Sequence, residues 1–546
     1  MCYRQFLLAS LIAGALSVGG SAFGQQPITF QNDSFSSRRV DAAVLSSAEE
    51  AAPVEEAAVM IGVFDAAESG EGKDSRKTCD CDSCLGGKGD GKGGCAAVRK
   101  AAAASHKGVF YANDFSYLAN AGCCDTYLGD RLKRLAVGDC WMVDVGGQYR
   151  MRYHHEQNIN NTGAVPNFLG LTGDDDNFLL HRTRLYLNAE YGSHFRFYGE
   201  MLDALSELGS GPPRVIEENR TEMQNMFVEV KGLDVGPGTI GARVGRQEIL
   251  LGAQRLVSPL DWANTRRTFD GARAMWKGDD WDVDGFWLRP MHRDAAHVKK
   301  LDSPNLDRQL YGMYGTYKGL TRDNLETYWL ALDYEDVGPS GFRYDTLGLH
   351  YWGSEGNWLY ELETGVQFGT NSDNSGHGAG AVTAGLGRKF PCTVFSPTLW
   401  AYYDWASGDN TVGNGYHHYE PLAHKYNGFM DIFGRRNLQD LNLQLTANLT
   451  EKVQFMCWYH YFALANGNDV PYNVDMTAFN GQAAGTSGSK DLGHELDFLI
   501  THNISPRTNM VYGYSHFFAG NYYTTTAGLP YRGDADFAYV QWTLDF

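Results

Sequence analysis

Arginine side chains recur at every second position in two segments of the sequence. One residue separates Arg150 from Arg152, and Arg182 and Arg184 repeat the spacing. Because successive side chains of a β-strand point to opposite faces, each pair shares one face of an expected strand. A guanidinium group stays charged at any relevant pH and binds carboxylates through two parallel hydrogen bonds. The pattern predicts an anion-binding wall made of Arg150, Arg152, Arg182, Arg184, Arg196, Arg246 and Arg273, although the strand that carries Arg246 has ambiguous parity.

The same arginines have a second interpretation as structural ion pairs. Glu190, Glu200 and Asp203 follow closely in the sequence and could neutralise them. A ladder of accessible arginines offers a polyanion many weak sites and so permits its movement. Fixed ion pairs would instead only hold the wall together. The sequence leaves both interpretations open.

Motifs for catalysis are weak. The sequence contains no G-x-S-x-G turn, no H-E-x-x-H helix and no phosphate-binding P-loop. The doublets His154-His155 and His417-His418 fall in expected loops or at strand ends, where we expect them to be solvated. Residues 174–176 are three consecutive aspartates that could bind Ca²⁺, but they lack the spaced ligands of an EF-hand. We therefore expect no catalytic residue, cofactor or resident metal.

The first residues predict export. Arg4 precedes the apolar run from Phe6 to Val18, and Ala22-Phe23-Gly24 has the spacing of a signal-peptidase site, with Gln25 as the expected mature N-terminus. The alternative, a retained anchor helix, suits the run less because about 20 apolar residues are needed to span a bilayer. We expect residues 1–24 to be a cleaved signal peptide.

Composition fits an exported β-barrel. The net charge of -19 argues against nucleic acid as a partner. Mean hydropathy is -0.37, and no later run approaches the length of a membrane helix, but a barrel needs apolar residues only at alternate positions. An aromatic content of 13% and 64 glycines against 16 prolines suit many strands joined by turns.

Seven cysteines lie before the expected barrel. Cys79, Cys81, Cys84 and Cys95 are closely spaced, and Cys123, Cys124 and Cys140 follow. Clustered thiolates can converge on Zn²⁺, whereas cysteines in an oxidising compartment form disulfides. We favour disulfides for an exported chain, and the connectivity stays open.

Composition also divides the chain. Residues 25–106, which end in a Gly/Lys-rich stretch, predict a low-complexity, Cys-containing periplasmic tether because they offer little apolar surface to bury. Residues 107–141 are richer in aromatic side chains and predict a small plug or cap. Residues 142–546 alternate polar and apolar positions and predict the barrel.

The alternation predicts about eighteen strands. In residues 440–449, Asp, Asn, Gln and Thr side chains alternate with Leu and Ala. Alternation alone fits a soluble sandwich or a membrane barrel, but short turns and long connections also alternate along the chain, as in an up-and-down transmembrane barrel. The strands are expected to begin near residues 143, 177, 193, 222, 239, 270, 280, 308, 325, 344, 357, 379, 395, 437, 452, 494, 508 and 536.

The last expected strand carries a further signal. Phe546, Leu544 and Trp542 share one face, opposite Asp545 and Thr543. This resembles the terminal strand that the barrel-assembly machinery recognises in bacterial outer-membrane proteins. We expect an all-β transmembrane antiparallel barrel in the outer membrane, in contact with its lipid and with that machinery.

The densest motif combines a G-R-Q segment with W-x-N-x-x-R-x-F-D-G. Together with His181 to Tyr186 and Phe195 to Glu200 upstream, it resembles the bacterial alginate export family of outer-membrane channels over about residues 144–290. The resemblance implies an eighteen-stranded barrel whose arginine-lined pore passes an anionic polysaccharide such as alginate. The motif residues are Gly245, Arg246, Gln247, Arg255, Trp262, Asn264, Arg267, Phe269, Asp270 and Gly271.

The C-terminal half argues against a uniformly basic pore. Glu361, Glu363, Asp440, Glu495 and Asp497 are expected on lumen faces, so one wall would be acidic. Mixed charge of this kind suits a general or small-anion diffusion porin, which remains an alternative to polysaccharide transport. A third alternative is a barrel that serves only to mount the N-terminal segment in the envelope.

Overall fold

The computed structural model describes residues 98–119, 126–160, 173–294, 297–334, 341–479, 483–529 and 531–546. The expected signal peptide and the cluster from Cys79 to Cys95 lie outside these residues. Cys140 is disulfide-bonded, whereas Cys392 and Cys457 are free. Within the described ranges, no helix is long and apolar enough to cross a membrane.

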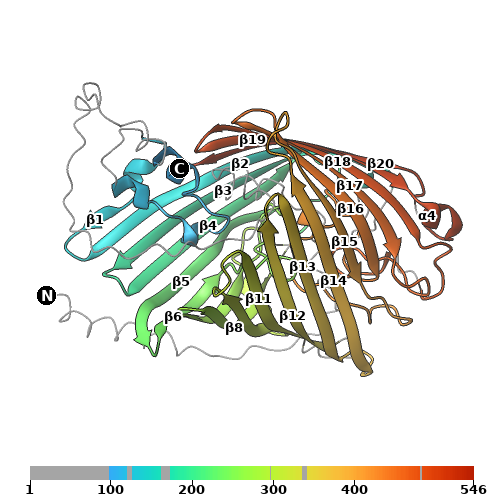
Figure 1. Cartoon of the computed structure of the whole chain (residues 1–546), viewed down its shortest axis with the longest axis horizontal. Helices are drawn as coiled ribbons and strands as arrows, with labels where there is room; N and C mark the ends of the chain where they lie inside the picture. The colour runs from blue at the N-terminus through green and yellow to red at the C-terminus, as the bar shows by residue number, and fades with distance from the viewer. Residues whose placement is uncertain are drawn as a thin grey trace.

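Eighteen antiparallel strands close into a β-barrel (Figure 1). Neighbours in sequence pair along the wall, and the last strand pairs with the first to close it. The wall strands are β2 (Trp141–Asn160), β3 (Asp174–Tyr191), β4 (Phe195–Glu207), β5 (Asn219–Val235), β6 (Gly238–Gln247), β7 (Phe269–Lys277), β8 (Trp281–His292), β10 (Arg308–Tyr317), β11 (Asp323–Tyr334), β12 (Phe342–Glu355), β13 (Trp358–Thr370), β14 (Gly376–Lys389), β15 (Thr398–Ala406), β16 (Leu438–Asn448), β17 (Val453–Leu464), β18 (Asp491–Ser505), β19 (Thr508–Ala519) and β20 (Ala535–Asp545).

Shorter elements lie beside the wall. Strand β1 (Leu135–Val137) pairs with the start of β2, and β9 (Ser303–Pro304) pairs with the end of β8. The helical elements with defined bounds are η3 (Phe110–Ala112), η4 (Ser116–Ala119), η5 (Asp130–Leu132), η6 (Ala423–Lys425) and α4 (Asn521–Thr525).

The strand prediction is confirmed. Every predicted start lies within three residues of an observed one: the eighth was predicted at 308 and begins at Arg308, and the second was predicted at 177 and begins at Asp174. The largest difference in extent is at the first connection. There, the alternation predicts a long connection at residues 154–176, whereas β2 and β3 run for 20 and 18 residues and extend into it.

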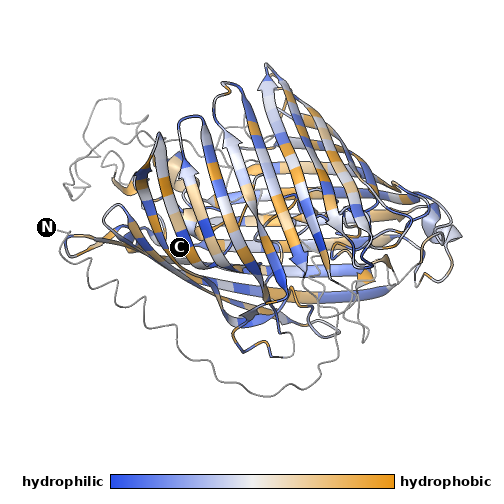
Figure 2. Cartoon of the chain, turned by 90° about the horizontal axis from the view of Figure 1, so that it is seen from below, coloured by the Kyte–Doolittle hydropathy of each residue, from blue (hydrophilic) through white to orange (hydrophobic). Residues whose placement is uncertain are grey.

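Polar and apolar residues alternate along the wall strands (Figure 2), and the exposed fractions of their side chains separate an apolar outer face from a polar inner face. On β3, Leu185 and Leu187 are 50% and 40% exposed. Arg182 and Arg184, at the alternate positions of the same strand, are 0% and 1% exposed. The outer face is the one that meets lipid in a membrane barrel, and the inner face surrounds the lumen.

Both ends of the wall lie at the rim that carries the short turns. The backbone N–H of Phe546 donates to the carbonyl of Gly147, and Gly147 donates back to Phe546. Lys133 Nζ donates to the Phe546 carbonyl at 3.0 Å and to the Val145 carbonyl at 2.6 Å. These bonds fix the end of β20 to β2 and to the segment that precedes it, beside which the C-terminus lies in Figure 1.

Residues 98–119 pack inside this rim. Phe110 and Tyr111 belong to a buried cluster with Tyr186, Tyr198 and Phe227, whose side chains point inward from β3, β4 and β5. Aromatic residues on the inner face of three adjacent strands therefore form the surface that receives the segment.

Arg507, in the turn before β19, holds this segment in place. Its guanidinium donates to the Ala102 carbonyl at 2.8 Å, to Tyr117 Oη at 2.6 Å and to Asp130 Oδ1 at 2.9 Å. The Arg507 and Asp130 side chains are each 3% exposed. Three contacts of this N-terminal stretch, 377 to 405 residues away in the sequence, are thus made by one cation.

We expect Arg507→Gln to release residues 98–119 and 126–132 while the barrel stays folded. Removing one partner of a buried ion pair costs about 3–5 kcal/mol. Limited proteolysis should cut this segment faster, and the mobility shift on heating in detergent should be retained. The exposed Arg131→Gln is the matched control. Equal cleavage rates for the two variants would contradict the assignment.

Candidate functional site: the lumen of the barrel

The loop between β6 and β7, residues 248–268, lies inside the barrel. Ile249, Leu251, Leu256 and Val257 are at most 6% exposed and pack on inner-face residues of the wall. Because apolar side chains lose water when they pack together, this loop is more stable inside the lumen than above it. It is the element that shapes the site.

Four of the predicted arginines on β2 and β3 form an arginine row that holds residues 261–263 of this loop. The row consists of Arg150, Arg152, Arg182 and Arg184. Arg150 donates to the Asp261 carbonyl at 2.8 Å, Arg152 to the Trp262 carbonyl at 2.9 Å, and Arg182 to the Asp261 carbonyl at 2.8 Å. The guanidinium carbon of Arg152 also lies 3.4 Å from the centroid of a Trp262 ring. The row therefore binds carbonyl oxygens, an aromatic face and a carboxylate of the chain itself.

The carboxylate is that of Asp261. Its oxygens lie 2.8 Å from Arg182, 3.9 Å from Arg150 and 4.0 Å from Arg184, and they also contact Arg266. The Asp261 side chain is 14% exposed. Four guanidinium groups thus surround one carboxylate, which the loop carries into the arginine row.

Glu248, at the start of the loop, neutralises the base of the row. It accepts from Arg184 at 3.3 Å and from Arg266, and both of its carboxylate oxygens are also bound by side-chain amides. Burial opposes its ionisation, but Arg266 and Arg184 outweigh burial and lower the pKa of Glu248. Burial and the neighbouring Arg184 lower the pKa of Arg266 to about 10.

The remaining arginines of the predicted set have separate partners. Arg196 donates to Asn188 and to the Tyr111 carbonyl. Arg246 pairs with Glu222 at 2.6 Å and with Asp270 at 2.9 Å. Arg273 pairs with Asp284.

The proposed structural counter-ions divide in the same way. Glu200 pairs with Arg184 at 2.6 Å. Glu190 instead pairs with Lys231, and Asp203 with Arg220.

The family motif is concentrated in the inward loop and the strand ends beside it. Gly245 has φ of 127° and lies against the backbone of β5, a position that favours glycine. Trp262 is fully buried and stacks on His424 at 4.5 Å, and Asn264 donates to the carbonyls of three different segments. The other motif residues sit at the ends of β6 and β7 or in the loop: Arg246, Gln247, Arg255, Arg267, Phe269, Asp270 and Gly271.

Arg255 carries the loop to the opposite wall. Its Nη1 donates to Glu361 Oε1 at 2.6 Å and to Glu363 Oε2 at 2.7 Å, both on β13. Burial alone would lower the pKa of Arg255, but Glu361 and Glu363 raise it well above its ordinary value. The loop therefore spans the lumen between a basic wall and an acidic wall.

A second inward loop, residues 407–437 between β15 and β16, packs on the first. Glu420 pairs with Arg267 at 2.8 Å and forms a parallel backbone bridge with Val257. Met430 N donates to Glu495 Oε1 at 2.8 Å. The acidic residues predicted on the inner face, which include Asp440, Glu495 and Asp497, lie inside the barrel.

The alternation predicts long connections at residues 250–269 and 405–436, and the side chains of both loops fill the lumen. One expectation about nearby histidines is wrong. His154, His417 and His418 were expected to be solvated, and they are 0%, 8% and 1% exposed. Burial lowers the pKa of His418 to about 3, so this ring is neutral. The available signal was the apolar content of both loops, which external loops would not need.

A closed antiparallel barrel with an apolar outer face and two long loops folded into its lumen defines a class, that of outer-membrane channels. The sequence profile of the family described as Alginate export matches residues 142–531. The chain belongs to this family.

Solved structures are similar to this barrel at low sequence identity. OccAB1 from Acinetobacter baumannii is 10% identical with a TM-score of 0.50, and the match covers 74% of this chain and 96% of that one. OccD3 (OpdP) from Pseudomonas aeruginosa is 12% identical with a TM-score of 0.49, covering 74% and 91%. A BenF-like porin from Pseudomonas fluorescens Pf-5 is 12% identical with a TM-score of 0.48, covering 74% and 99%. No curated protein matches the sequence.

Proposed function

We propose that this outer-membrane channel passes an anionic polysaccharide, such as alginate or its oligomers, and that the seven arginines of the predicted set form the path for its carboxylates. The proposal combines the family with the chemistry of the basic wall. Guanidinium groups bind carboxylates through charge-assisted hydrogen bonds, and a row of them provides successive weak sites.

The observation that carries the proposal is the position of Asp261. Its carboxylate lies among Arg150, Arg182, Arg184 and Arg266. A uronate presents the same group on a sugar ring, so Asp261 marks the place where a substrate carboxylate binds after the loop withdraws. The loop carboxylate then acts as an internal competitor of the substrate.

A general or small-anion porin is the second candidate, and the acidic wall favours it. Glu361 and Glu363 on β13 face the lumen opposite the arginine row, and Arg255 neutralises only part of their charge. Opposed walls create a transverse field that orients small polar solutes. The two candidates differ in whether long polyanions block the current that small ions carry.

Conductance measurements on Arg182→Gln/Arg184→Gln separate these candidates. Glutamine keeps polarity and approximate size but removes two charges from the row. We expect the double variant to assemble, to lose anion preference, and to bind uronate oligomers at least about tenfold more weakly, since each lost carboxylate contact is worth about 1.5–3 kcal/mol. The readouts are reversal potential in a salt gradient and block of single-channel current.

Arg322→Gln is the matched control, because Arg322 is 69% exposed and pairs with Glu355 outside the row. Anion selectivity and oligomer block that stay unchanged in an assembled double variant would rule out polyanion binding by this wall. Anion selectivity without block by long oligomers in the parent protein would favour the small-anion porin.

We also propose roles for the parts of the chain outside the barrel. Residues 1–24 act as a cleaved signal peptide, residues 25–106 as a periplasmic tether and residues 107–141 as a plug or cap. The packing of residues 98–119 inside the short-turn rim supports the plug. The terminal strand is the contact for the barrel-assembly machinery.

A further inference from the structure

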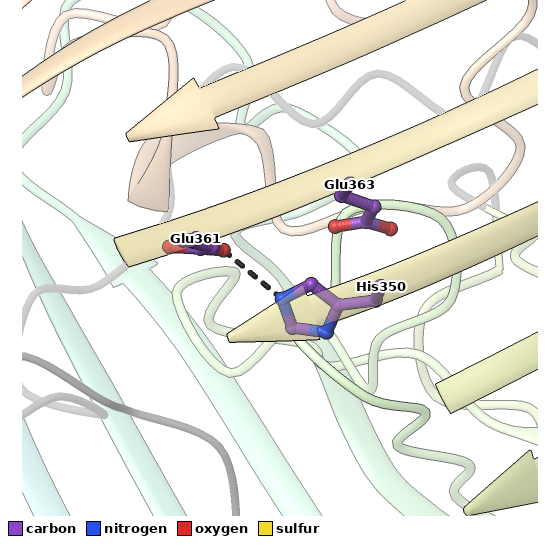
Figure 3. Close-up of side chains that lie close together, drawn as sticks. All are labelled: His350, Glu361 and Glu363. Carbon is purple, nitrogen blue, oxygen red and sulfur yellow. Dashed lines mark hydrogen bonds and ion pairs between the residues drawn. The ribbon is translucent and has the colours of Figure 1, made fainter. Parts of the chain in front are cut away.

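Strand pairing brings one histidine and two glutamates together on the acidic wall. His350 on β12 lies directly opposite Glu363 on β13, and Glu361 is two residues away on the same face. One ligand atom from each of the three lies within 4.8 Å of the others (Figure 3). Because adjacent strands set these positions, the group is rigid before any ligand arrives.

The outward atoms of all three side chains are already held. His350 Nδ1 lies 3.0 Å from Glu326 Oε2, Tyr402 Oη donates to Glu361 Oε2 at 2.9 Å, and Tyr328 Oη donates to Glu363 Oε1 at 3.1 Å. A carboxylate behind a histidine is the usual outer partner of a metal-binding imidazole, since it fixes the ring and its tautomer. The remaining atoms, His350 Nε2, Glu361 Oε1 and Glu363 Oε2, lie close to one another, and His350 Nε2 is 3.2 Å from Glu361 Oε1.

A cationic nitrogen already lies between the two carboxylates. Arg255 Nη1 donates to both Glu361 Oε1 and Glu363 Oε2, and its Nε has no partner among the described residues. Both ring nitrogens of His350 face carboxylate oxygens, Glu326 at 3.0 Å and Glu361 at 3.2 Å, so the ring is protonated. The three carboxylates of Glu326, Glu361 and Glu363 carry -3, and with one guanidinium and one imidazolium the group keeps -1. A divalent cation that replaces the Arg255 guanidinium and the Nε2 proton of His350 leaves this charge unchanged.

We propose that His350, Glu361 and Glu363 form a binding site for a divalent transition-metal ion, with Zn²⁺ as the best match, in which the metal displaces the Arg255 guanidinium. An imidazole and two carboxylates are ligands that Zn²⁺ takes with a water in the fourth position. His350 Nε2 and Glu361 Oε1 are 3.2 Å apart, close to the separation of about 3.4 Å that ligands have around tetrahedral Zn²⁺.

The test is Zn²⁺ titration of the purified full-length protein in detergent after chelator washing. We expect the parent protein to bind a zinc ion that His350→Gln loses, and Arg255→Gln to bind it about tenfold more tightly because the internal competitor is gone. Glu326→Gln should weaken binding about 10- to 100-fold through the imidazole orientation. His516→Gln, from a histidine–aspartate pair on β19 and β20, is the matched control.

Cobalt distinguishes this site from the N-terminal cysteines, which can also bind Zn²⁺. Co²⁺ bound by nitrogen and oxygen gives d–d absorption without a thiolate charge-transfer band, and His350→Gln should remove that component. Equal zinc affinity and stoichiometry in the parent protein and in His350→Gln would overturn the site. If His350→Gln fails to assemble, Arg255→Gln decides, because unchanged or weaker zinc binding there would also overturn it.

Discussion

Asp261→Asn is expected to open the channel and to increase its preference for anions. The change removes the carboxylate from a group of four arginines but keeps the size of the side chain. Loss of one partner of a buried ion pair costs about 3–5 kcal/mol, and here that cost falls on the docking of the β6–β7 loop. The freed guanidinium groups then bind carboxylates that enter from solution.

Two readouts follow from this change. Single-channel conductance should rise because the β6–β7 loop is docked across the lumen for a smaller fraction of the time. Block by uronate oligomers should strengthen at least about tenfold, since the internal competitor is removed. Asp279→Asn, an exposed aspartate in the β7–β8 turn, is the control. Parent-like conductance and block in Asp261→Asn would contradict the role of Asp261 as a stand-in for substrate.

The barrel could be predicted from the sequence because each wall strand is in contact with two different environments. Alternation such as that from Asp440 to Leu449 reflects lumen on one side and lipid on the other, and a shift of one residue would reverse both. Local patterning therefore fixes strand positions with little help from the rest of the chain. All eighteen starts agree with the structure to within three residues for this reason.

The loops could not be predicted in the same way, since their partners lie far away in the sequence. Arg255 meets Glu361, and Arg267 meets Glu420, across 106 and 153 residues. No periodicity relates such pairs. Apolar residues in a connection show that it is buried somewhere, but only the closed barrel shows that the available place is the lumen.

The arginine row lies between these two cases. Its common face followed from the spacing of Arg150, Arg152, Arg182 and Arg184, and the structure places all four inside the barrel. Their main partner, the β6–β7 loop, could not be predicted from the spacing, because this loop reaches β2 and β3 only through tertiary folding. Glu200 was the one proposed counter-ion that pairs with this row, through Arg184.

Glu248→Gln should release the same loop from its other end. Glu248 is 0% exposed and pairs with Arg184 and Arg266, so the neutral side chain leaves two buried guanidinium groups short of negative charge. The expected cost is about 3–5 kcal/mol. Hydrogen exchange of the amides in residues 249–265 should accelerate, while exchange in the barrel strands stays slow. Glu355→Gln, at 70% exposure, is the control, and equal loop protection in both variants would contradict the assignment.

The pH dependence of the parent protein gives an independent check on Glu248. Because its pKa is lowered from the ordinary value of 4.5, its stabilising contribution is complete above that value and is lost only as pH falls below it. The loop should therefore stay docked between pH 7 and about pH 5, and its amide protection should fall only at lower pH. In Glu248→Gln the loop should already be undocked at pH 7. The difference in amide protection between the two proteins should therefore shrink as pH falls below about pH 5. A parent loop that undocks near pH 6 would mean that another group, and not Glu248, controls its position.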